Sequence, residues 1–486
     1  MAEEINFAGE SAHWCLNANK GYYRFLVLFF NCLLTFGSYF CFDMPSVLQD
    51  SFTGTYGINC TTNSHNVTKC EEHLGMTETE YNLLYTVYAW MNALVVIGSG
   101  IFIDKVGQRV GAVFFSALCV VGSAIFASGY FLKGRGSMLV LFLTGRLLFG
   151  AGNGSLTIAQ NRISAYWFEG KELAFAFGAT LSFSRLGSIL NFFLTKDFSQ
   201  TYGLKWTLWG GVFLCILGFG GALVLYVLDK NGMEQIAQQR EPGAKKSRKM
   251  KVGDIRHLSL QFVLLAVTTM SFYNTVFPFV ADASQFIREK YHYSDDSEMP
   301  SYYAGSVYDV SLVATPILGI IVDYLGYRGL LAFVCAIFTI PVYLILAFTT
   351  WHPLYGTVLL GLTYSAAATS LWPSAPLVVN PGVLGTALGL MTSLQMIGIG
   401  VCSLVVGAIL DKLKTNDHKW EYVMIFLLAN AVLCVISALF LNIVDWRRSG
   451  ILNKTRKRNS QKMKKLTDSR EALVGDAAEG DGDSIN

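Results

Sequence analysis

An arginine and an aspartate in the middle of long apolar stretches have the clearest potential for chemistry. Arg185 lies within the apolar stretch 172–195, and Asp309 lies within the stretch 302–322. An ionisable group at such a position is costly unless it faces a cavity or a partner. Arginine stays protonated, and its planar fork can bind a carboxylate through two hydrogen bonds. We therefore expect Arg185 to bind the carboxylate of a solute.

For Asp309 the sequence leaves three roles open. It could form a structural ion pair with Arg185, bind the ammonium group of a substrate, or take up a proton. Asp43, at the end of the first apolar stretch, is a second possible proton carrier, because no histidine lies inside an apolar stretch. Whether protons take part in the function therefore stays open.

Polar and aromatic residues near the middle of other apolar stretches are weaker candidates for lining a wet cavity. Aromatic side chains are common in membrane segments, so packing is the more frequent role for each of them. Side-chain amides are better candidates, because an amide that faces lipid is unfavourable. The candidates are Tyr39, Tyr88, Trp90, Asn153, Tyr273, Asn274, Tyr364, Trp372 and Gln395.

These residues belong to a chain with the composition of a membrane protein. Only 15% of its 486 residues are charged, whereas a soluble domain carries roughly 25%. Twelve windows hold the ~20 apolar residues that a helix needs to cross a bilayer, and lipid requires each window to pair its own backbone groups. The windows lie near 22–42, 82–103, 110–132, 138–160, 172–195, 206–228, 258–281, 302–322, 328–350, 353–380, 383–410 and 421–444.

The predicted fold class is an all-α membrane protein whose twelve transmembrane helices form two pseudo-symmetric six-helix bundles. The first bundle spans 1–228 and the second spans 258–446. A basic linker at 229–257 joins them. The polar tail at 447–486 has no apolar periodicity, and we expect it to be disordered.

The distribution of basic residues predicts the orientation. With both termini in the cytosol, the cytosolic segments hold 25 of the 37 Lys and Arg residues and the opposite side holds 10, as the positive-inside rule requires. The loop 43–81 then lies in the lumen, where Asn59 and Asn66 are in N-glycosylation sequons. In the same loop, Cys60 and Cys70 could form a disulfide in an oxidising compartment or remain free thiols.

A ten-residue phrase occurs once in each predicted bundle. It is GIFIDKVGQR at 100–109 and GIIVDYLGYR at 319–328, each between the second and third windows of its bundle. Two copies at equivalent positions favour a functional element over a chance polar loop, and we expect the two turns to act as a gate. Its residues are Gly100, Asp104, Lys105, Gly107 and Arg109 in the first copy and Gly319, Asp323, Gly326 and Arg328 in the second.

Each shared position of the phrase has a physical use. The first glycine lets a neighbouring helix approach closely, and the second allows the positive φ that a tight turn between helices needs. The aspartate can accept hydrogen bonds from the amides of a facing helix N-terminus. The arginine can pair with a carboxylate or with a helix C-terminus.

The repeated phrase resembles the signature loop of the major facilitator superfamily, and the resemblance covers all twelve windows. A second motif similar to one of that superfamily is RLLFGAGNG in the fourth window, with Arg146, Gly150 and Gly154 at the matching positions. The resemblance implies a transporter of two bundles around a central site. It also implies that Arg146 organises helix packing.

Three further segments resemble the family of major facilitator superfamily domain-containing protein 1. They are FGSYFCFDMPSVL, AQNRISAYWFEGKEL and LSFSRLGSILN. This resemblance implies a lysosomal uniporter of dipeptides that works with a glycosylated single-pass accessory subunit. The chain departs from the family where an acidic residue is expected before the serine of the fourth window, because Gly154 precedes Ser155. Recognition of a carboxylate therefore carries over, and recognition of a free amino group is in doubt.

Motifs of enzymes are absent from the sequence. It has no G-x-S-x-G nucleophile elbow and no G-x-x-x-x-G-K-[ST] phosphate loop, and its histidines lack the spacing of a metal site. We therefore expect no enzymatic activity, no cofactor, no metal and no nucleic-acid partner, but a small-molecule substrate and a lipid bilayer. Two other functions stay open: a proton-coupled symporter of organic anions such as monocarboxylates, and a non-transporting membrane scaffold.

Overall fold

The computed structural model describes most of the chain. The described residues are 18, 20–54, 57–62, 68–168, 173–237, 259–294, 297–379, 384–448 and 450–454. Only the backbone is described at 58–62, 68–72, 104, 173–175, 236–237, 323 and 384–386. Residues 238–257 of the predicted linker and the tail beyond 454 lie outside the described residues.

The described chain consists of helices and one small hairpin. Local sequence signals define several helix ends. The helix that starts at Glu78 has a capping box, in which Glu80 N donates to the Thr77 hydroxyl at 3.1 Å and Thr77 N donates to the Glu80 carboxylate at 2.9 Å. The elements are α2 (Gly21–Val47), α3 (Gln49–Thr53), β1 (Gly57–Thr62), β2 (Thr68–His73), α4 (Glu78–Val106), α5 (Gln108–Ser128), η1 (Gly129–Leu132), α6 (Ser137–Trp167), α7 (Leu173–Ala237), α8 (Leu260–Lys290), α9 (Met299–Leu325), α10 (Arg328–Phe348), α11 (Pro353–Leu371), η3 (Trp372–Ser374), α12 (Ala375–Val378), α13 (Leu384–Lys412) and α14 (Lys419–Arg448).

The predicted twelve transmembrane helices are confirmed. Ten helices in the described ranges are long and apolar enough to cross a membrane. One of them, α7, is two helices that meet at Gly203, whose φ of 81° and ψ of 162° are not helical. Dividing α7 at Gly203 and adding the 19-residue α11 accounts for every predicted window.

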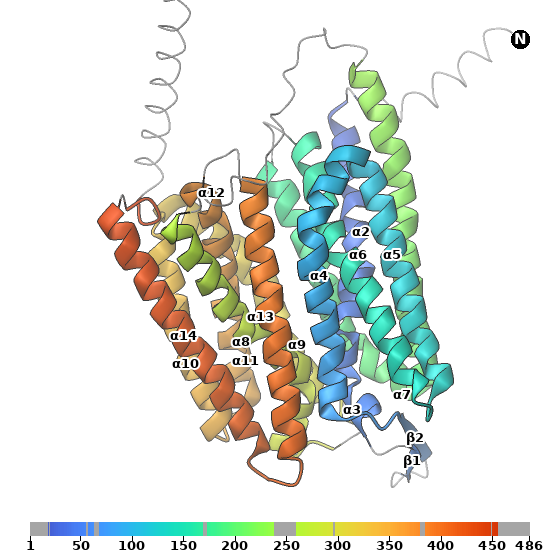
Figure 1. Ribbon diagram of the computed structural model, residues 1–486. Coiled ribbons are helices and arrows are strands. Elements are labelled where there is room, and N and C mark those ends of the chain that lie inside the picture. Colours follow the sequence, from blue (N-terminus) through green and yellow to red (C-terminus); the bar gives the residue numbers. More distant parts are fainter. Residues whose placement is uncertain are drawn as a thin grey trace, which may run out of the picture.

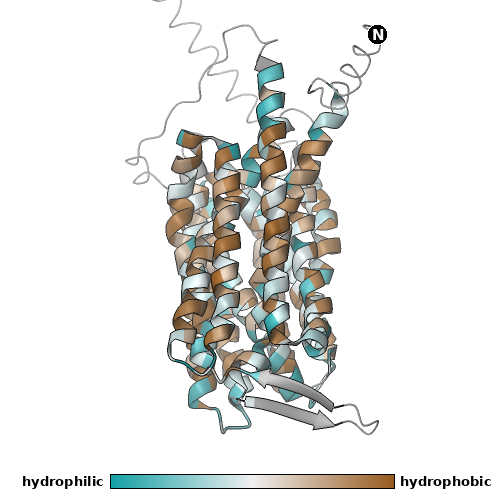
Figure 2. Ribbon diagram, turned by 90° about the vertical axis from the view of Figure 1, so that its right-hand side faces the viewer, coloured by the Kyte–Doolittle hydropathy of each residue, from teal (hydrophilic) through white to brown (hydrophobic). Residues whose placement is uncertain are grey.

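The helices form two bundles that stand side by side (Figure 1). We call α2 to α7 the N-bundle and α8 to α14 the C-bundle. Hydrophobic residues cover the flanks of the molecule, whereas hydrophilic residues gather at its two ends (Figure 2). This is the surface that a protein embedded in a bilayer needs.

The two ends of the molecule differ. One end carries the antiparallel hairpin of β1 and β2, together with α3, and we call it the hairpin end (Figure 1). The opposite end carries the α4–α5 and α9–α10 turns, and we call it the turn end. The sequence did not predict the hairpin, because the loop 43–81 lacks a long alternating apolar pattern.

The boundary of the first bundle also differs from the prediction. We expected the linker to begin at 229, but α7 continues to Ala237. The extension is anchored, since Trp167 Nε1 donates to the Asp229 carboxylate at 2.8 Å and the backbone N–H of Ala18 donates to the side-chain oxygen of Gln235 at 2.9 Å. Contacts with the rest of the N-bundle thus hold a polar segment in helical form.

The interface between the bundles is closed at the hairpin end. There the Tyr81 hydroxyl donates to the Ala281 carbonyl at 2.8 Å. The carboxylate of Asp411 accepts hydrogen bonds from the backbone N–H groups of Glu78 and Thr79 at 2.9 and 2.8 Å. A carboxylate of the C-bundle therefore caps the N-terminus of α4, where the helix dipole favours negative charge.

Toward the turn end the bundles separate. Within the described residues, the last side-chain hydrogen bond between α4 and α13 joins the Ser393 hydroxyl to the Ala93 carbonyl at 2.6 Å. Beyond it, a Cβ added at Gly100 on α4 or at Gly389 on α13 would meet no atom within 4 Å. The structure therefore represents a state that is closed at the hairpin end and open toward the turn end.

Candidate substrate site

Arg185 connects the two bundles near mid-depth. It lies on α7, and only 6% of its surface is exposed. Nη1 donates to the backbone carbonyl of Ser311 at 2.8 Å and also contacts the hydroxyl of Thr315, both on α9. The guanidinium carbon lies 5.2 Å from the centre of the Tyr364 ring on α11. A carbonyl dipole, a hydroxyl and an aromatic face thus hold the cation.

No carboxylate forms an ion pair with Arg185 in the part of the chain that the structure describes. Both hydrogen bonds of Arg185 are donated by Nη1. Its Nε and Nη2 have no hydrogen-bond partner, and neither atom is fully buried. A desolvated arginine without an anion is unfavourable, and its open donors suit the two oxygens of a carboxylate. The geometry is therefore compatible with the predicted role of Arg185.

Asp309 lies on the same helix as the partners of Arg185 but on a different face. It is half-buried, and Val313 and Ile320, four and eleven positions further along its face of α9, are 64% and 73% exposed. No ion pair joins Asp309 to Arg185. The structural ion pair considered from the sequence is not formed, and the outward position of Asp309 does not favour a substrate role.

Asn153 and Tyr88 belong to a hydrogen-bonded link between three helices. The amide nitrogen of Asn153 on α6 donates to the Tyr88 hydroxyl on α4 at 2.8 Å. Its amide oxygen accepts from the Ser38 hydroxyl on α2 at 2.8 Å. Both functions of the amide are thus occupied inside the N-bundle, which favours a packing role for this predicted pair.

Three aromatic candidates form one wall beside Arg185. Trp372 Nε1 donates to the Tyr273 hydroxyl at 2.8 Å. The Tyr273 ring stacks on Phe277 at a centroid distance of 5.7 Å and meets Tyr364 edge-on at 5.9 Å. Since Tyr364 also faces Arg185, the C-bundle presents an aromatic surface next to the cation.

The two predicted amides of the C-bundle retain unused acceptors. Asn274 and Gln395 are 5% and 3% exposed, and the side-chain oxygen of each has no hydrogen-bond partner. A Cβ added at Gly398 would lie 2.6 Å from the oxygen of Asn274. Gln395 precedes Gly398 by three positions and so shares that face of α13. Both amides therefore lie where α8 meets α13.

Two further aromatic candidates have different surroundings. Tyr39 is half-buried and within electrostatic range of Arg185 and Tyr364. Trp90 is 40% exposed, and its Nε1 donates to the Ile397 carbonyl on α13 at 3.3 Å. Tyr39 thus lies near the cation, whereas Trp90 belongs to the contact between α4 and α13.

The α9 side chains that face the N-bundle were not among the residues predicted from the sequence. The Tyr308 hydroxyl donates to the carboxylate of Asp43 at 3.2 Å, and Asp43 is only 2% exposed. Tyr308, Ser311 and Thr315 follow one another at spacings of three and four, which is a polar stripe on one helix face. This spacing is the sequence signal that could have predicted a polar face of α9.

The two turn glycines of the repeated phrase have the predicted backbone. Gly107 has φ 99° and Gly326 has φ 77°, which only glycine adopts readily. The close helix approach expected at Gly100 is wrong for this conformation, since nothing lies within 4 Å of an added Cβ. At Gly319 the nearest atom, on Thr369, is 3.8 Å away. These two glycines have no close helix neighbour because the bundles are separated at the turn end.

The charged residues of the phrase differ in their contacts. Lys105 is exposed, and the guanidinium of Arg109 lies 6.0 Å from the centre of the Tyr226 ring. Arg328 donates to the Pro373 carbonyl at 2.9 Å, just after the end of α11, which is the predicted kind of pairing. The side chains of Asp104 and Asp323 lie outside the described residues.

Arg146 and its two glycines have the packing geometry that the motif implied. Arg146 is 3% exposed and donates to the Phe42 carbonyl at 3.1 Å. A Cβ at Gly150 would lie 2.5 Å from the Tyr88 carbonyl, and one at Gly154 would lie 1.9 Å from the Asn92 amide oxygen. Only glycine permits this approach of α4 and α6.

The backbone of the hairpin places two cysteines opposite each other. Cys60 on β1 and Cys70 on β2 are register partners in an antiparallel pair, and such partners have Cα separations that a disulfide can span. The side chains of Asn59, Cys60 and Cys70, and Asn66 as a whole, lie outside the described residues. The strand register supports the predicted disulfide between Cys60 and Cys70. The glycans stay a prediction.

Comparison with protein families decides the identity of the fold. Residues 25–401 match the model of the Major Facilitator Superfamily. The chain belongs to this superfamily. It is 33% identical over 443 residues to the lysosomal dipeptide transporter MFSD1 of Homo sapiens, covering 89% of this chain and 88% of that protein. The MFSD1 of Danio rerio is 32% identical over 456 residues, with 91% of each chain covered. The chain therefore also belongs to the MFSD1 family, and its named relatives are transporters.

Solved structures of other superfamily members share the fold. The nucleoside transporter NupG superimposes with a TM-score of 0.58 at 13% identity, covering 85% of this chain and 98% of that one. A bacterial homologue of the human lysosomal transporter Spinster, in an inward-facing and unoccupied conformation, gives a TM-score of 0.56 at 16% identity, covering 87% and 97%. At these identities the likeness establishes the fold alone.

Proposed function

We propose that this superfamily member is an alternating-access carrier that moves dipeptides out of the lysosome to the cytosol. The observation that carries the proposal is Arg185, a buried cation with no carboxylate partner and with donors left open. The C-terminal carboxylate of a peptide has the charge and the planar shape that this fork binds. The MFSD1 relatives supply the substrate class and the compartment.

The contacts of Arg185 suggest how substrate binding affects the movement of the bundles. The guanidinium on the N-bundle is bonded to Ser311 and Thr315 of the C-bundle. A substrate carboxylate that takes over donors of Arg185 replaces a contact between bundles by one to the substrate. Binding thereby changes the free-energy difference between the two conformations, as alternating access requires.

The proposed orientation places the hairpin end in the lumen and the turn end in the cytosol. The conformation described above then faces the cytosol. In the opposite state the bundles meet at the turn end, and Gly100 and Gly319 become close-approach positions there. The paired turns, with Lys105 exposed in this state, form the cytosolic gate. Asp104 and Asp323 are expected to latch it.

Recognition of the substrate amine would involve other residues than Arg185. Gly154 packs against Asn92, so that this position has no room for an acidic side chain. The unused oxygens of Asn274 and Gln395 are enclosed in this conformation, and we propose them as acceptors for an ammonium group in a state that exposes them. The accessory subunit implied by the family resemblance stays a prediction.

A second candidate function is proton-coupled symport of monocarboxylates. One observation favours it, namely that no carboxylate forms an ion pair with Arg185 among the described residues, so that a solute with one carboxylate and no amine would satisfy the cation. A scaffold without transport is disfavoured, because it has no need of an open cation beside an aromatic wall.

Uptake into vesicles that contain the purified protein tests the proposal. A dipeptide, the same dipeptide with an amidated C-terminus, and a monocarboxylate are compared with and without a pH gradient. Saturable uptake of the free dipeptide alone, without need of a gradient, is expected. Equal uptake of the amidated peptide removes Arg185 from the substrate site, and gradient-dependent uptake of the monocarboxylate favours the second candidate.

A further inference from the structure

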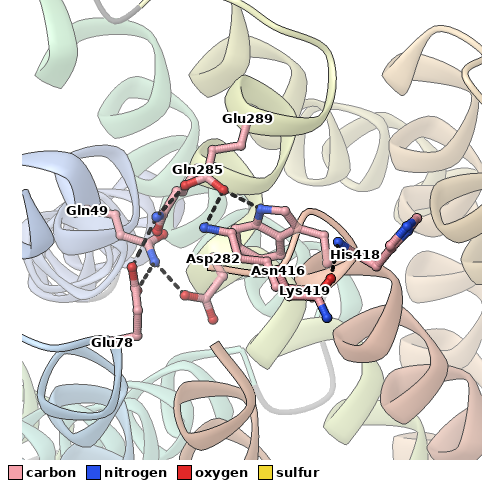
Figure 3. A network of polar contacts seen from close by, with 9 residues as sticks. Gln49, Glu78, Asp282, Gln285, Glu289, Asn416, His418 and Lys419 are labelled. Atoms are coloured by element: carbon pink, nitrogen blue, oxygen red, sulfur yellow. Dashed lines mark hydrogen bonds and ion pairs between the residues drawn. The ribbon is translucent and has the colours of Figure 1, made fainter. Parts of the chain in front are cut away.

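Two buried carboxylates from opposite bundles meet at the hairpin end (Figure 3). Glu78 at the start of α4 is 9% exposed, and Asp282 on α8 is 2% exposed. The amide nitrogen of Gln49 on α3 donates to Asp282 at 2.6 Å and to Glu78 at 3.2 Å. Because one nitrogen binds both carboxylates, the distance between the two acceptor oxygens cannot exceed the sum of these two hydrogen-bond lengths.

Among the described residues no cation forms an ion pair with either carboxylate, and Lys419 of α14, which is paired with Glu289, acts on Glu78 only through a longer-range attraction. In the described ranges no Lys, Arg or His lies within ion-pair distance of Glu78 or Asp282. The other side-chain donors to the two carboxylates are amides. Gln285 donates to Glu78 at 3.1 Å, and Asn82 donates to Asp282 at 3.3 Å. The second oxygen of Asp282 and the amide oxygens of Gln49, Asn82 and Gln285 are buried without partners. The cluster has more acceptors than donors, and a bound proton reduces that imbalance.

Glu289 and Asp411 are two further carboxylates of the C-bundle at this end of the molecule. Glu289 on α8 accepts from Gln285 at 2.8 Å and forms an ion pair with Lys419 of α14 at 2.7 Å. Asp411 on α13 is occupied by the backbone N–H groups at the start of α4. Each already has a cation or two N–H donors, so neither supplies the missing donor of the cluster.

The elements of the N-bundle around the cluster also carry titratable groups. On α3, Asp50 forms ion pairs with Arg288 of α8 and, at 4.0 Å, with Lys196 of α7. On α4, the Tyr81 hydroxyl is bonded to the Ala281 carbonyl, and Tyr85 lies within electrostatic range of Asp282. None of these groups places a positive charge within ion-pair distance of Glu78 or Asp282.

Two like charges in one buried site cannot both ionise without a large penalty. A proton on either carboxyl removes the repulsion and adds a donor. When the hairpin end opens, the N-bundle carries Glu78 and Gln49 away from Asp282, and water can solvate both carboxylates. The closed state therefore binds a proton more tightly than the open state, and by linkage protons favour closure.

We propose that Glu78 and Asp282 form a proton-operated latch that shifts the equilibrium of the hairpin end toward the closed state when the compartment on that side is acidic. The proton enters and leaves on the same side, because the cluster separates only when that side opens. Acidity thus sets the position of the gate without protons crossing the membrane. The inference rests on the two-state rocking of the proposed function and on no particular substrate.

A distance measurement without substrate tests the latch. Spin labels are attached to Arg135→Cys and Lys414→Cys, two exposed positions at the hairpin end of different bundles, in protein whose native cysteines are replaced. Lowering the pH from ~7.5 to ~5 should increase the short-distance population. The double variant Glu78→Gln with Asp282→Asn mimics the protonated pair and should stay closed at both pH values. Each single variant should keep a weaker pH response, because the remaining carboxylate no longer faces a second charge but is still desolvated in the closed state.

Two control variants separate the latch from other titrating groups. Glu80→Gln makes the same chemical change in the same helical turn, but Glu80 bonds only to Thr77. His418 also titrates, since Glu421 at 2.9 Å raises the pKa of its imidazole, but both residues belong to the C-bundle. Glu80→Gln and His418→Gln should keep the wild-type pH response.

Three outcomes overturn the latch. They are an unchanged distance distribution in the wild type between the two pH values, a wild-type pH response in the double variant, and loss of the response in His418→Gln. Since no substrate is present, none of these results depends on whether dipeptides are carried.

Discussion

Arg146 and Arg185 are two buried arginines of the same bundle with opposite surroundings. Arg146 is enclosed by aromatic rings, with Tyr85 and Phe126 each 5.2 Å from its guanidinium carbon, and its Nε is fully buried without a partner. Arg185 faces one ring, reaches across to the C-bundle, and keeps two nitrogens that are not enclosed. The exposed fractions are similar, at 3% and 6%, so burial alone does not separate the two.

The difference lies in what each arginine can still bind. Arg146 is surrounded by groups of its own bundle that stay together when the bundles rock. Arg185 is bonded to α9, which moves relative to α7, and its open donors give a solute access to the charge. An arginine at the moving interface can respond to substrate, whereas one inside a rigid bundle supports the fold.

The largest expected effect comes from the same substitution at both positions. Arg185→Met should abolish dipeptide uptake, because methionine fills the space but offers no donor to a carboxylate. Arg146→Met should keep most of the uptake, because an apolar side chain suits the aromatic cage and removes a desolvated charge. Vesicle uptake per folded molecule, with folding checked by size-exclusion chromatography, measures both. Loss of uptake in well-folded Arg146→Met would break the comparison.

The double variant Arg185→Ala with Asp309→Ala tests whether the two charges depend on each other. Asp309 forms no ion pair with Arg185 and lies on the outward face of α9, so its removal should not restore uptake to Arg185→Ala. Asp309→Ala alone should retain uptake and serves as the control. Recovery of transport in the double variant would mean that Arg185 only neutralises Asp309.

A smaller effect is expected from lysine. Arg185→Lys keeps the charge but loses the planar fork, and the loss of one charged hydrogen bond weakens substrate binding by about 1–3 kcal/mol. The half-saturating dipeptide concentration should therefore rise, while an amidated dipeptide stays inactive. An unchanged half-saturating concentration would indicate that the fork contributes nothing to the contact.

The smallest predicted effect concerns the ring that faces the cation. Tyr364→Leu removes the aromatic face 5.2 Å from Arg185, an interaction worth about 0.5–2 kcal/mol. Dipeptide uptake should fall by a modest factor, with the fold intact. Phe126→Leu, the matched change beside Arg146, should lower the melting temperature more than it lowers uptake. Equal effects of the two variants on uptake would contradict the assigned roles.

Part of the site was visible in the sequence because it depends on local features. Arg185 stood out as a charge within an apolar stretch, and Gly107 and Gly326 as turn residues with a special backbone. Glu78, Asp282 and Gln49 were not recognised as a cluster, because they lie in three elements far apart in the chain. Asp309 resembled Arg185 in depth, but depth does not tell which way a side chain points.

The sequence by itself determined the twelve spans, the division into two bundles and the turns that repeat between them. These follow from hydropathy over about 20 residues and from backbone preferences of single residues, which act along the chain. Only the tertiary structure decided which charges face each other. Each residue turns a helix by about 100°, so the face that Asp309 or Arg185 presents, and its neighbours across the bundle interface, are set by the packing of whole helices.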